Sequence, residues 1–297
     1  MLTEPAPAKV NLALHVVGRL GDGRHALESP VAFTAFGDEV RVETAERDTL
    51  AIDGPFAEAL EEGALEGGPN LVAAARDALR ASAPASMPVA IRLTKRIPVA
   101  AGLGGGSADA AATLRALRRL WRLALSDEDL AAIGARLGAD VPMCVLSRAL
   151  VASGAGERMV PIEGGIDAMG LGGRGVVLAN PGVPVATADV FGALERRDNA
   201  SLPPPGRDPL AWLAGCRNDL EAPARRIAPE IGAVLAAMEG AAASATDGPV
   251  LARMSGSGAT CFALTRTPDA AEALARRLAA DHPAWFVAAT RFIDRDA

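Results

Sequence analysis

The chain has 297 residues, of which 50% are hydrophobic and 22% are charged, a composition typical of a soluble globular protein with one large or two modest domains. No stretch reaches the roughly 18 apolar residues that a membrane helix needs, and residues 1–7 lack the basic and apolar parts of a signal peptide, so we expect a cytoplasmic protein. The formal net charge of −6 argues against a broad nucleic-acid surface but is compatible with a small anionic ligand.

The first predicted element is a half-buried strand over residues 9–17. Apolar side chains alternate there with polar ones, among them Lys9 and Asn11. The polar face of this strand is a place where catalytic groups could lie. Residues 18–25 have the composition of a turn, and residues 39–44 that of a second strand.

A strand, a glycine loop and a helix are predicted next. Asn70 is a candidate N-cap for a helix that runs to about residue 83. Alternating apolar residues indicate a strand over residues 89–93, and after Ser107 apolar residues recur at helical spacing to about residue 123. Ser126 and Asp129 then resemble a capping box for a helix that Gly138 would end.

The second half of the chain also mixes strands and helices. Residues 154–175 are rich in glycine without a clear period, and we place a domain boundary there, which gives domains at residues 1–158 and 159–297. The pattern beyond this boundary predicts strands at 176–179, 261–264 and 285–292, and helices at 230–238 and 268–280. Three consecutive prolines mark residues 201–208 as a surface loop.

Cysteine and lysine are both scarce. Cys144, Cys216 and Cys261 are widely spaced with no CxxC pair, so we expect reduced thiols in the core, without a disulfide framework or a structural metal. Lys9 and Lys95 are the only lysines in a chain whose other basic residues are arginines. A compact ammonium suits a tight site that a planar guanidinium does not, which makes each lysine a candidate for a specific role.

The strongest local signal is the sequence PVAAGLGGGSADAAA at residues 98–112. Glycines let backbone N–H groups converge on an anion, and the following helix points its positive end the same way. An ordinary flexible turn is the alternative, but the preceding strand, Ser107 as a helix cap and the helix after it favour phosphate binding. The loop lacks the Lys-Ser/Thr of a P-loop and the last glycine of a dinucleotide fingerprint. It is no hydrolase elbow either, because Asp109 stands where that motif needs glycine.

Residues 98–112 resemble the ATP loop of the GHMP kinases, the family named for galactokinase, homoserine, mevalonate and phosphomevalonate kinases. PAKVNL at 7–12 and MSGSGA at 254–259 resemble the first and third motifs of that family, in the same order along the chain. The resemblance implies an α+β fold of two lobes, the N-terminal lobe ribosomal-protein-S5-like and the C-terminal lobe ferredoxin-like, with the substrate between them. It implies direct phosphoryl transfer from ATP with Mg²⁺.

The resemblance also implies which residues bind ATP: Pro98, Val99, Ala100, Ala101, Gly102, Leu103, Gly104, Gly105, Gly106, Ser107, Ala108, Gly256 and Ser257. Ser107 is the one candidate for a contact with magnesium, although an N-cap hydroxyl explains this serine equally well. Asp109, on the first helical turn, is explained by the helix dipole alone.

Asp140 and Lys9 are the candidate catalytic residues. A carboxylate within hydrogen-bond reach of the substrate hydroxyl can accept its proton, but Asp140 also stands two residues before Pro142, where it could cap a short helix. The residues alone leave both interpretations open, and the family resemblance favours the catalytic one. An ammonium at Lys9 would keep Asp140 ionised and stabilise the developing alkoxide; a solvated lysine at a strand end is the alternative.

Four further stretches, GDGRH at 21–25, LGADVP at 137–142, PGV at 181–183 and NDLE at 218–221, are similar to one branch of the family. That branch phosphorylates the 2-hydroxyl of a cytidine-diphosphate-linked methylerythritol in the non-mevalonate route to isoprenoids. The resemblance implies substrate contacts by Asn11, Arg24, His25, Asn70, Thr187 and Phe191. Phe191 would stack on the cytosine, with plain core packing as the alternative.

One departure concerns Arg24. The related enzymes usually place a tyrosine before the histidine, and this chain contains no tyrosine. A guanidinium plane can stack on a base and can also neutralise a diphosphate, so either the cytosine site persists in altered form or the substrate differs.

Two rivals to this interpretation remain at the level of the sequence. One is another GHMP kinase acting on a smaller alcohol, of the homoserine or mevalonate type, and the other is an ATP-binding sensor without turnover. Lys9 and Asp140 argue against the sensor. We expect a small-molecule substrate and no nucleic-acid or membrane partner, and the sequence leaves open whether the chain forms a homodimer.

Overall fold

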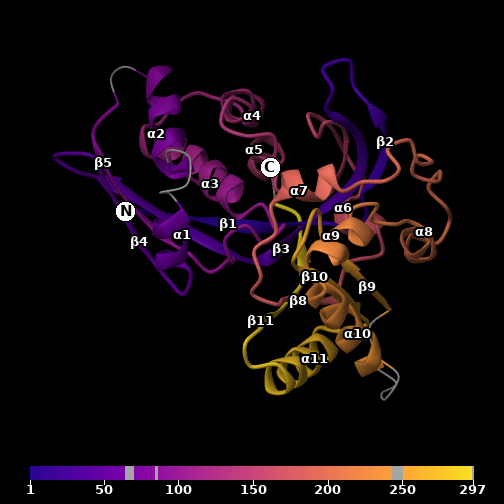
Figure 1. Cartoon of the computed structure of the whole chain (residues 1–297). Coiled ribbons are helices and arrows are strands. Elements are labelled where there is room, and N and C mark those ends of the chain that lie inside the picture. The colour runs from indigo at the N-terminus through magenta and orange to yellow at the C-terminus, as the bar shows by residue number, and fades with distance from the viewer. Residues whose placement is uncertain (64–69, 84–85, 243–249, 296–297) are drawn as a thin grey trace. The chain divides into compact units, whose positions relative to one another are not determined.

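The computed structural model describes residues 1–63, 70–83, 86–242 and 250–295 (Figure 1). The chain divides into two compact units that are interleaved in sequence. Unit 1 is drawn from Met1–Lys9, Gly37–Val99 and Gly104–Ser147, and unit 2 from Val10–Phe36, Ala100–Leu103 and Arg148–Ala297. The predicted domain boundary between residues 158 and 159 follows the chain, not these units, and stays a prediction.

Unit 1 contains one side of a mixed sheet. The second half of β3 (His25–Thr44) pairs antiparallel with β5 (Val89–Thr94), from Glu39 opposite Thr94 to Thr44 opposite Val89. On the other side of β5, β4 (Thr49–Asp53) runs parallel to it, and β1 (Leu2–Asn11) also pairs with β3. The alternation that predicted β5 is confirmed, because Val89, Ile91 and Leu93 are buried and Arg92 is exposed.

The helices of unit 1 are α1 (Ala57–Gly63), α2 (Leu71–Ala81), α3 (Gly105–Leu120), α4 (Asp127–Gly134) and α5 (Val141–Leu146). α3 lies at their centre, and all ten of its residues from Ala108 to Leu117 are buried (Figure 1). Five of these ten are alanines, which let α2 and α5 pack closely against it.

Two predicted helix caps in unit 1 are confirmed. The Asn70 side chain accepts a hydrogen bond from the Val72 N–H at 2.9 Å and caps α2, which ends at Ala81. Ser126 and Asp129 form the predicted reciprocal capping box of α4. This helix ends at Gly134, four residues before the expected Gly138, because residues 135–137 form a turn.

The predicted strand over residues 9–17 is two strands. β1 ends at Asn11 and β2 (His15–Arg19) begins after a break at which the Leu12 N–H donates to the Pro30 carbonyl. The Leu14 N–H donates instead to the Arg217 carbonyl, a partner outside the sheet. Both faces are buried, since the polar residues of the segment are covered as well as the apolar ones. The predicted strand at 39–44 is likewise only the end of the 20-residue β3.

Unit 2 contains an antiparallel group of strands built on the first half of β3. β2, β6 (Leu150–Gly154) and β12 (Phe292–Ile293) each pair with β3, and β7 (Arg158–Pro161) pairs with β6. The glycine-rich stretch at 154–175 therefore holds β7 and the short α6 (Gly165–Ala168). The remaining short helices are α7 (Thr187–Gly192), α8 (Pro209–Gly215) and α9 (Glu221–Ile227).

A second sheet in unit 2 has the antiparallel order β11-β8-β10-β9. Its strands are β8 (Gly175–Asn180), β9 (Leu251–Met254), β10 (Cys261–Thr265) and β11 (Phe286–Thr290). α10 (Glu230–Ala242) and α11 (Pro268–Asp281) pack against this sheet (Figure 1). Every residue of β8 and β10 is buried, and apolar side chains of α10 and α11 belong to the same core cluster.

The sequence predicted most of unit 2 correctly. The strands at 176–179 and 261–264 and the helices at 230–238 and 268–280 are confirmed within a few residues. The single strand expected at 285–292 is wrong, because β11 ends at Thr290 and Phe292 begins β12, which pairs with β3 instead. Residues 201–208 contain no helix or strand and are mostly exposed, as the prolines predicted.

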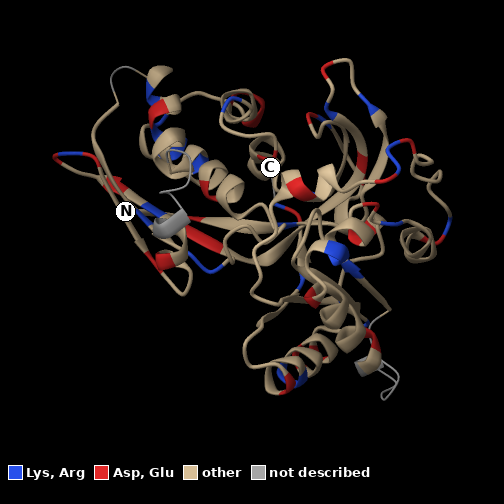
Figure 2. Cartoon of the chain, in the orientation of Figure 1, with Lys and Arg blue, Asp and Glu red and all other residues tan. Residues whose placement is uncertain are grey.

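Together these elements confirm the predicted α+β class. Cys144, Cys216 and Cys261 are buried free thiols, as expected. Residues of both charge signs lie along α11 (Figure 2). Within this helix, Arg276 and Arg277 form i,i+4 ion pairs with Glu272 and Asp281. Across the described ranges, no helix combines the length and apolar character needed to cross a bilayer.

Candidate active site

The glycine loop leads into α3, and the helix begins earlier than expected. Gly104 is the N-cap, in the left-handed region at φ 65°, and as a glycine it makes no side-chain capping hydrogen bond. The prediction that Ser107 caps the helix is wrong, because Ser107 lies within the first turn. Since no capping side chain among the described residues binds the first N–H groups of this 16-residue helix, its positive end is available to an anion.

Glycine is required at Gly104 for a second reason. A Cβ there would lie 2.8 Å from Cγ of Lys9, so the stem of that lysine runs directly along the loop. A Cβ at the next residue, Gly105, would lie 2.9 Å from Nζ of Lys95. Within unit 1 the loop therefore lies against the two lysines of the chain.

Lys9 and Asp140 form an ion pair in unit 1, with Nζ and Oδ2 3.2 Å apart. The lysine side chain is 9% exposed and the aspartate side chain 36% exposed. Lys9 is therefore not the solvated strand-end residue of the alternative interpretation. Asp140 does precede α5, but its backbone is helical and its side chain makes no capping hydrogen bond. The structure therefore favours a role for this carboxylate beyond helix capping.

Lys95 belongs to a buried network that sequence reasoning missed. Its ammonium donates to Asp38 and, at 2.8 Å, to Asp109, and all three side chains are at most 2% exposed. The other oxygen of Asp38 accepts the Ile97 N–H at 2.7 Å. Asp109 is thus an ion-paired residue of the core, and not merely a complement to the helix dipole. The scarcity of lysine singled out Lys95, but no local pattern pointed to its partners.

The Lys95 network holds two carboxylates against one ammonium. Burial raises the pKa of Asp109 to about 8, and the nearby Asp38 charge adds to this shift while Lys95 opposes it. Burial lowers the pKa of Lys95, the charges of Asp109 and Asp38 raise it, and the net shift is upward. Within the described residues, Oδ1 of Asp109 is buried without a hydrogen-bond partner. A proton on Asp109 would leave one net carboxylate for one ammonium.

In unit 2, the middle of the glycine loop contacts the third motif. The Thr260 N–H donates to the Ala101 carbonyl at 3.2 Å, and the Ser255 hydroxyl donates to the Gly102 carbonyl at 3.2 Å. Gly102 has φ 74°, and a Cβ there would lie 2.7 Å from the carbonyl oxygens of Ser255 and Gly258. Only glycine fits this position.

The first motif also contacts the third within unit 2. The Asn11 N–H donates to the Ser255 hydroxyl at 3.1 Å, and a Cβ at Gly256 would lie 3.0 Å from Oδ1 of Asn11. The Asn218 side chain donates to the carbonyls of Met254 and Gly256, both at 2.8 Å, and so holds the turn. Each of the three motifs therefore contacts the other two, although they are distant in sequence: the first contacts the glycine loop through Lys9 and the third motif through Asn11, and the glycine loop contacts the third motif through Gly102.

Three of the candidate substrate residues in unit 2, His25, Thr187 and Phe191, take part in two contacts. One contact joins Thr187 to Ser257, a candidate for binding ATP, and the other joins His25 to Phe191. Thr187 and Ser257 share a hydroxyl–hydroxyl hydrogen bond of 2.8 Å. The rings of His25 and Phe191 stack, with centroids 4.9 Å apart and planes at 26°. In the described part of the chain, Nε2 of His25 is buried without a hydrogen-bond partner, and burial lowers the pKa of this histidine.

Two other candidates are engaged elsewhere. The Arg24 guanidinium, 60% exposed, pairs with Asp22 at 2.8 Å. It is His25, its neighbour, that lies against Phe191. Asn70 belongs to unit 1, where its side-chain oxygen caps α2.

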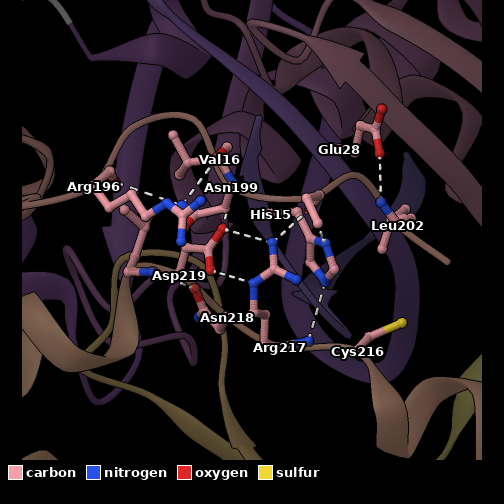
Figure 3. Close-up of polar contacts among 12 residues, drawn as sticks. His15, Val16, Glu28, Arg196, Asn199, Leu202, Cys216, Arg217, Asn218 and Asp219 are labelled. Atoms are coloured by element: carbon pink, nitrogen blue, oxygen red, sulfur yellow. Dashed lines mark hydrogen bonds and ion pairs between the residues drawn. The ribbon is translucent and has the colours of Figure 1, made fainter. Parts of the chain in front are cut away.

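His15, to which the sequence assigned no role, has a structural one (Figure 3). It is fully buried, with Nδ1 3.1 Å from the Ala200 carbonyl and Nε2 accepting the Arg217 N–H at 3.1 Å. Asp219 accepts the Val16 N–H at 2.7 Å and the Arg217 Nε–H at 2.6 Å. This network ties the segment after α7 to β2 within unit 2.

Comparison with known proteins places these features in a family. The family model described as the GHMP kinases N terminal domain matches residues 70–148, and that of the GHMP kinases C terminal matches residues 208–284. The chain is 48% identical to 4-diphosphocytidyl-2-C-methyl-D-erythritol kinase of Chelativorans sp. (strain BNC1), over 96% of this chain and 94% of that protein. It is 45% identical to the enzyme of the same name from Agrobacterium fabrum (strain C58), over 98% and 96%.

Solved structures agree with the sequence relatives. A crystal structure of 4-(cytidine 5'-diphospho)-2C-methyl-D-erythritol kinase superposes with a TM-score of 0.75 at 33% identity, over 98% of this chain and 99% of that one. Homoserine kinase from Cytophaga hutchinsonii superposes with a TM-score of 0.69 at 16% identity, over 99% of this chain and 95% of that one. The second likeness shows the shared fold alone.

Proposed function

This chain belongs to the GHMP kinases, as its three motifs predicted, and on that premise we propose that it phosphorylates the 2-hydroxyl of 4-diphosphocytidyl-2-C-methyl-D-erythritol. Such a reaction would place it in the non-mevalonate route to isoprenoids. The observation that carries the kinase chemistry is the Lys9–Asp140 pair, and the choice of substrate is supported by relatives of that name along nearly the whole chain.

Asp140 serves as the general base. Its carboxylate accepts the proton of the substrate hydroxyl as the oxygen attacks the γ-phosphorus in line with the leaving ADP. The Lys9 ammonium, 3.2 Å away, holds this carboxylate in place and stabilises the alkoxide that develops on the attacking oxygen. Transfer is direct, because a loose phosphoryl-transfer transition state mainly requires positioning and charge stabilisation.

The ATP phosphates are held by the glycine loop at 98–108 and by Gly256 and Ser257. The fit is supported by the uncapped N-terminus of α3 and by the positions at which a Cβ would collide with neighbouring atoms. Among the described residues there is no group of three His, Cys, Asp or Glu that could hold a metal ion. Mg²⁺ would accordingly be held largely by phosphate oxygens and water, with the Ser107 hydroxyl as a protein ligand, and would neutralise charge on the phosphates.

The substrate is recognised by Asn11, Arg24, His25, Asn70, Thr187 and Phe191. The stacked pair of His25 and Phe191 presents aromatic faces of the kind on which a cytosine can stack. Arg24 supplies a cationic side chain for the diphosphate, in place of a tyrosine.

The test is product analysis with the purified enzyme. With Mg-ATP and 4-diphosphocytidyl-2-C-methyl-D-erythritol, we expect stoichiometric ADP and a new phosphomonoester on C2, identified by ³¹P NMR and mass spectrometry. Mevalonate and homoserine serve as competing acceptors. Turnover of either of these, without turnover of the cytidine compound, would favour a GHMP kinase for a smaller alcohol. The presence of Arg24 in place of the usual tyrosine is the feature of the sequence that supports this alternative. ATP binding without turnover of any acceptor would favour a sensor.

A further inference from the structure

Arg115 is a buried arginine in the middle of α3, with its side chain only 1% exposed. Its Nε donates to the Glu4 carboxylate at 2.6 Å and its Nη2 to the Pro5 carbonyl at 2.7 Å. Its Nη1 donates to the Cys144 carbonyl at 2.7 Å. One guanidinium in unit 1 thus joins three elements: α3, the strand β1 and the helix α5.

The two elements that Arg115 holds are those that carry the catalytic pair. Lys9 lies on β1, four residues after Pro5. Asp140 directly precedes α5, and its carbonyl accepts the N–H of Cys144 at 3.1 Å. Cys144, whose carbonyl accepts a hydrogen bond from Arg115, is therefore itself hydrogen-bonded to Asp140.

A buried arginine is weak evidence for stability alone. Removing a charge from water is costly, and apolar side chains of similar volume often replace a buried ion pair without loss of stability. What an apolar side chain cannot do is set the distance between a strand and a helix through directed hydrogen bonds. A planar guanidinium with five N–H donors in a fixed fork does so.

We propose that Arg115 is a positioning residue, which sets the separation of Lys9 and Asp140 by binding β1 and α5 at once. It does not touch the reacting atoms and acts through the backbone of the two elements. The inference rests on the proposed function for the roles of Lys9 and Asp140, but it concerns a residue outside the family motifs. A displacement of about 1 Å between reacting groups can reduce the rate about a hundredfold. Loss of the Arg115 hydrogen bonds to β1 and α5, which we call the Arg115 clamp, should therefore be measurable as a lower kcat.

The first variant is Arg115→Lys, which keeps the positive charge but cannot reach three acceptors on two elements. We expect kcat to fall about 10- to 100-fold, with the KM for ATP changed less than about threefold, because the α3 N-terminus stays formed. Arg119→Gln is the matched control. Arg119 also pairs with Glu4, at 3.0 Å, but its side chain is 54% exposed, and we expect kcat within about twofold of the parent.

A double-mutant cycle separates positioning from general destabilisation. If Arg115 acts through Asp140, Arg115→Lys should cost little further activity in an Asp140→Asn background, while its effect on the thermal midpoint should be the same in both backgrounds. Should Arg115→Lys fail to fold, Glu4→Gln takes its place in the cycle, since it weakens the same clamp and keeps both carbonyl acceptors. For Glu4→Gln we expect a loss of about threefold in kcat.

The proposal is overturned if a folded Arg115→Lys enzyme keeps near-parental kcat. Equal fold losses in the presence and absence of the Asp140 carboxylate would also overturn it and leave Arg115 a structural residue. Failure of the proposed function looks different, because the parent enzyme itself would then not turn over the cytidine substrate.

Discussion

At the scale of single residues, the Lys9–Asp140 pair combines a buried ammonium with a carboxylate that keeps about a third of its surface accessible. That asymmetry suits catalysis, since the accessible partner can meet a substrate hydroxyl while the covered one supplies charge in a region of low dielectric constant. A purely structural ion pair would not require one accessible member. Substitutions of Lys9 or Asp140 should therefore lower kcat without weakening the binding of ATP.

Asp140→Asn should lower kcat at least about a hundredfold and leave the KM for ATP nearly unchanged, because the base acts in the transition state and ATP is bound by other residues. Steady-state kinetics with a separate nucleotide-binding measurement checks this. Lys9→Ala should behave similarly, and Asp77→Asn, at an exposed carboxylate on α2, serves as the control. Near-normal turnover in a folded Asp140→Asn protein would reduce Asp140 to a structural residue.

The aromatic pair of His25 and Phe191 allows a test of base recognition. Phe191→Ala should raise the KM for the cytidine substrate about 10- to 100-fold, the size of a lost stacking contact of about 1–3 kcal/mol, with the KM for ATP unchanged. His25→Ala should act in the same direction, because His25 is the stacking partner in the structure. An unchanged substrate KM in both variants would remove the physical support for cytidine recognition.

The role of Arg24 can be distinguished from that of His25 and Phe191 by the dependence of the substrate KM on ionic strength. Its guanidinium pairs with Asp22 and is largely exposed, which suits a diphosphate contact better than a stacking plane. We expect the substrate KM of the parent to rise more steeply with ionic strength than that of Arg24→Tyr. Parallel salt responses of the two proteins would argue instead for stacking by Arg24.

At the scale of elements, α3 is the helix on which the candidate site is built. Its N-terminus directly follows the glycine loop, its first turns are bound to Lys95 through Asp109, and its middle is bound to β1 and α5 through Arg115. Polar interactions fix the helix at both places, while its alanines allow close packing. A helix held in this way can present its N-terminal N–H groups in one orientation.

The Lys95 network should make stability depend on pH. The folded-state pKa of Asp109 is raised from 3.8 to about 8, so the folded protein retains a proton that the unfolded chain releases. The stability contributed by this protonation is fully present below about pH 4 and is lost as pH rises through about 8, with a slope of at most about 1.4 kcal/mol per pH unit. Asp109→Asn has no such proton to lose.

We therefore expect the thermal midpoint of the parent to fall relative to that of Asp109→Asn between pH 5 and pH 9. Calorimetry of both proteins without nucleotide, at several pH values and constant ionic strength, measures the difference. Parallel curves over that range would show that Asp109 is ionised in the folded protein across the whole interval.

At the scale of the whole molecule, the net charge of −6 and the anionic ligands of the proposed reaction are compatible because the positive groups are local. A helix N-terminus and a single ammonium act over a few ångströms, whereas the overall charge is screened beyond about 10 Å at 0.1 M salt. The proposed function thus depends on a few placed donors, and not on a basic surface.

The sequence by itself determined the features that depend on neighbouring residues. The helix caps at Asn70 and Ser126, the alternation of β5 and the glycine motifs are encoded within a few positions, and the motifs identified the family. The side chains whose position depends on distant elements could not be found in this way. Lys95 meets Asp38 across 57 positions, and Arg115 meets Glu4 across 111.

Only the tertiary structure decided these long-range partners, as well as the break between β1 and β2 and the start of α3 at Gly105. Alternation and capping predict what a segment does on its own. Which buried charge meets which partner depends instead on how strands and helices pack, because a charged side chain removed from water must find its counter-charge or hydrogen-bond acceptors on whatever element lies against it.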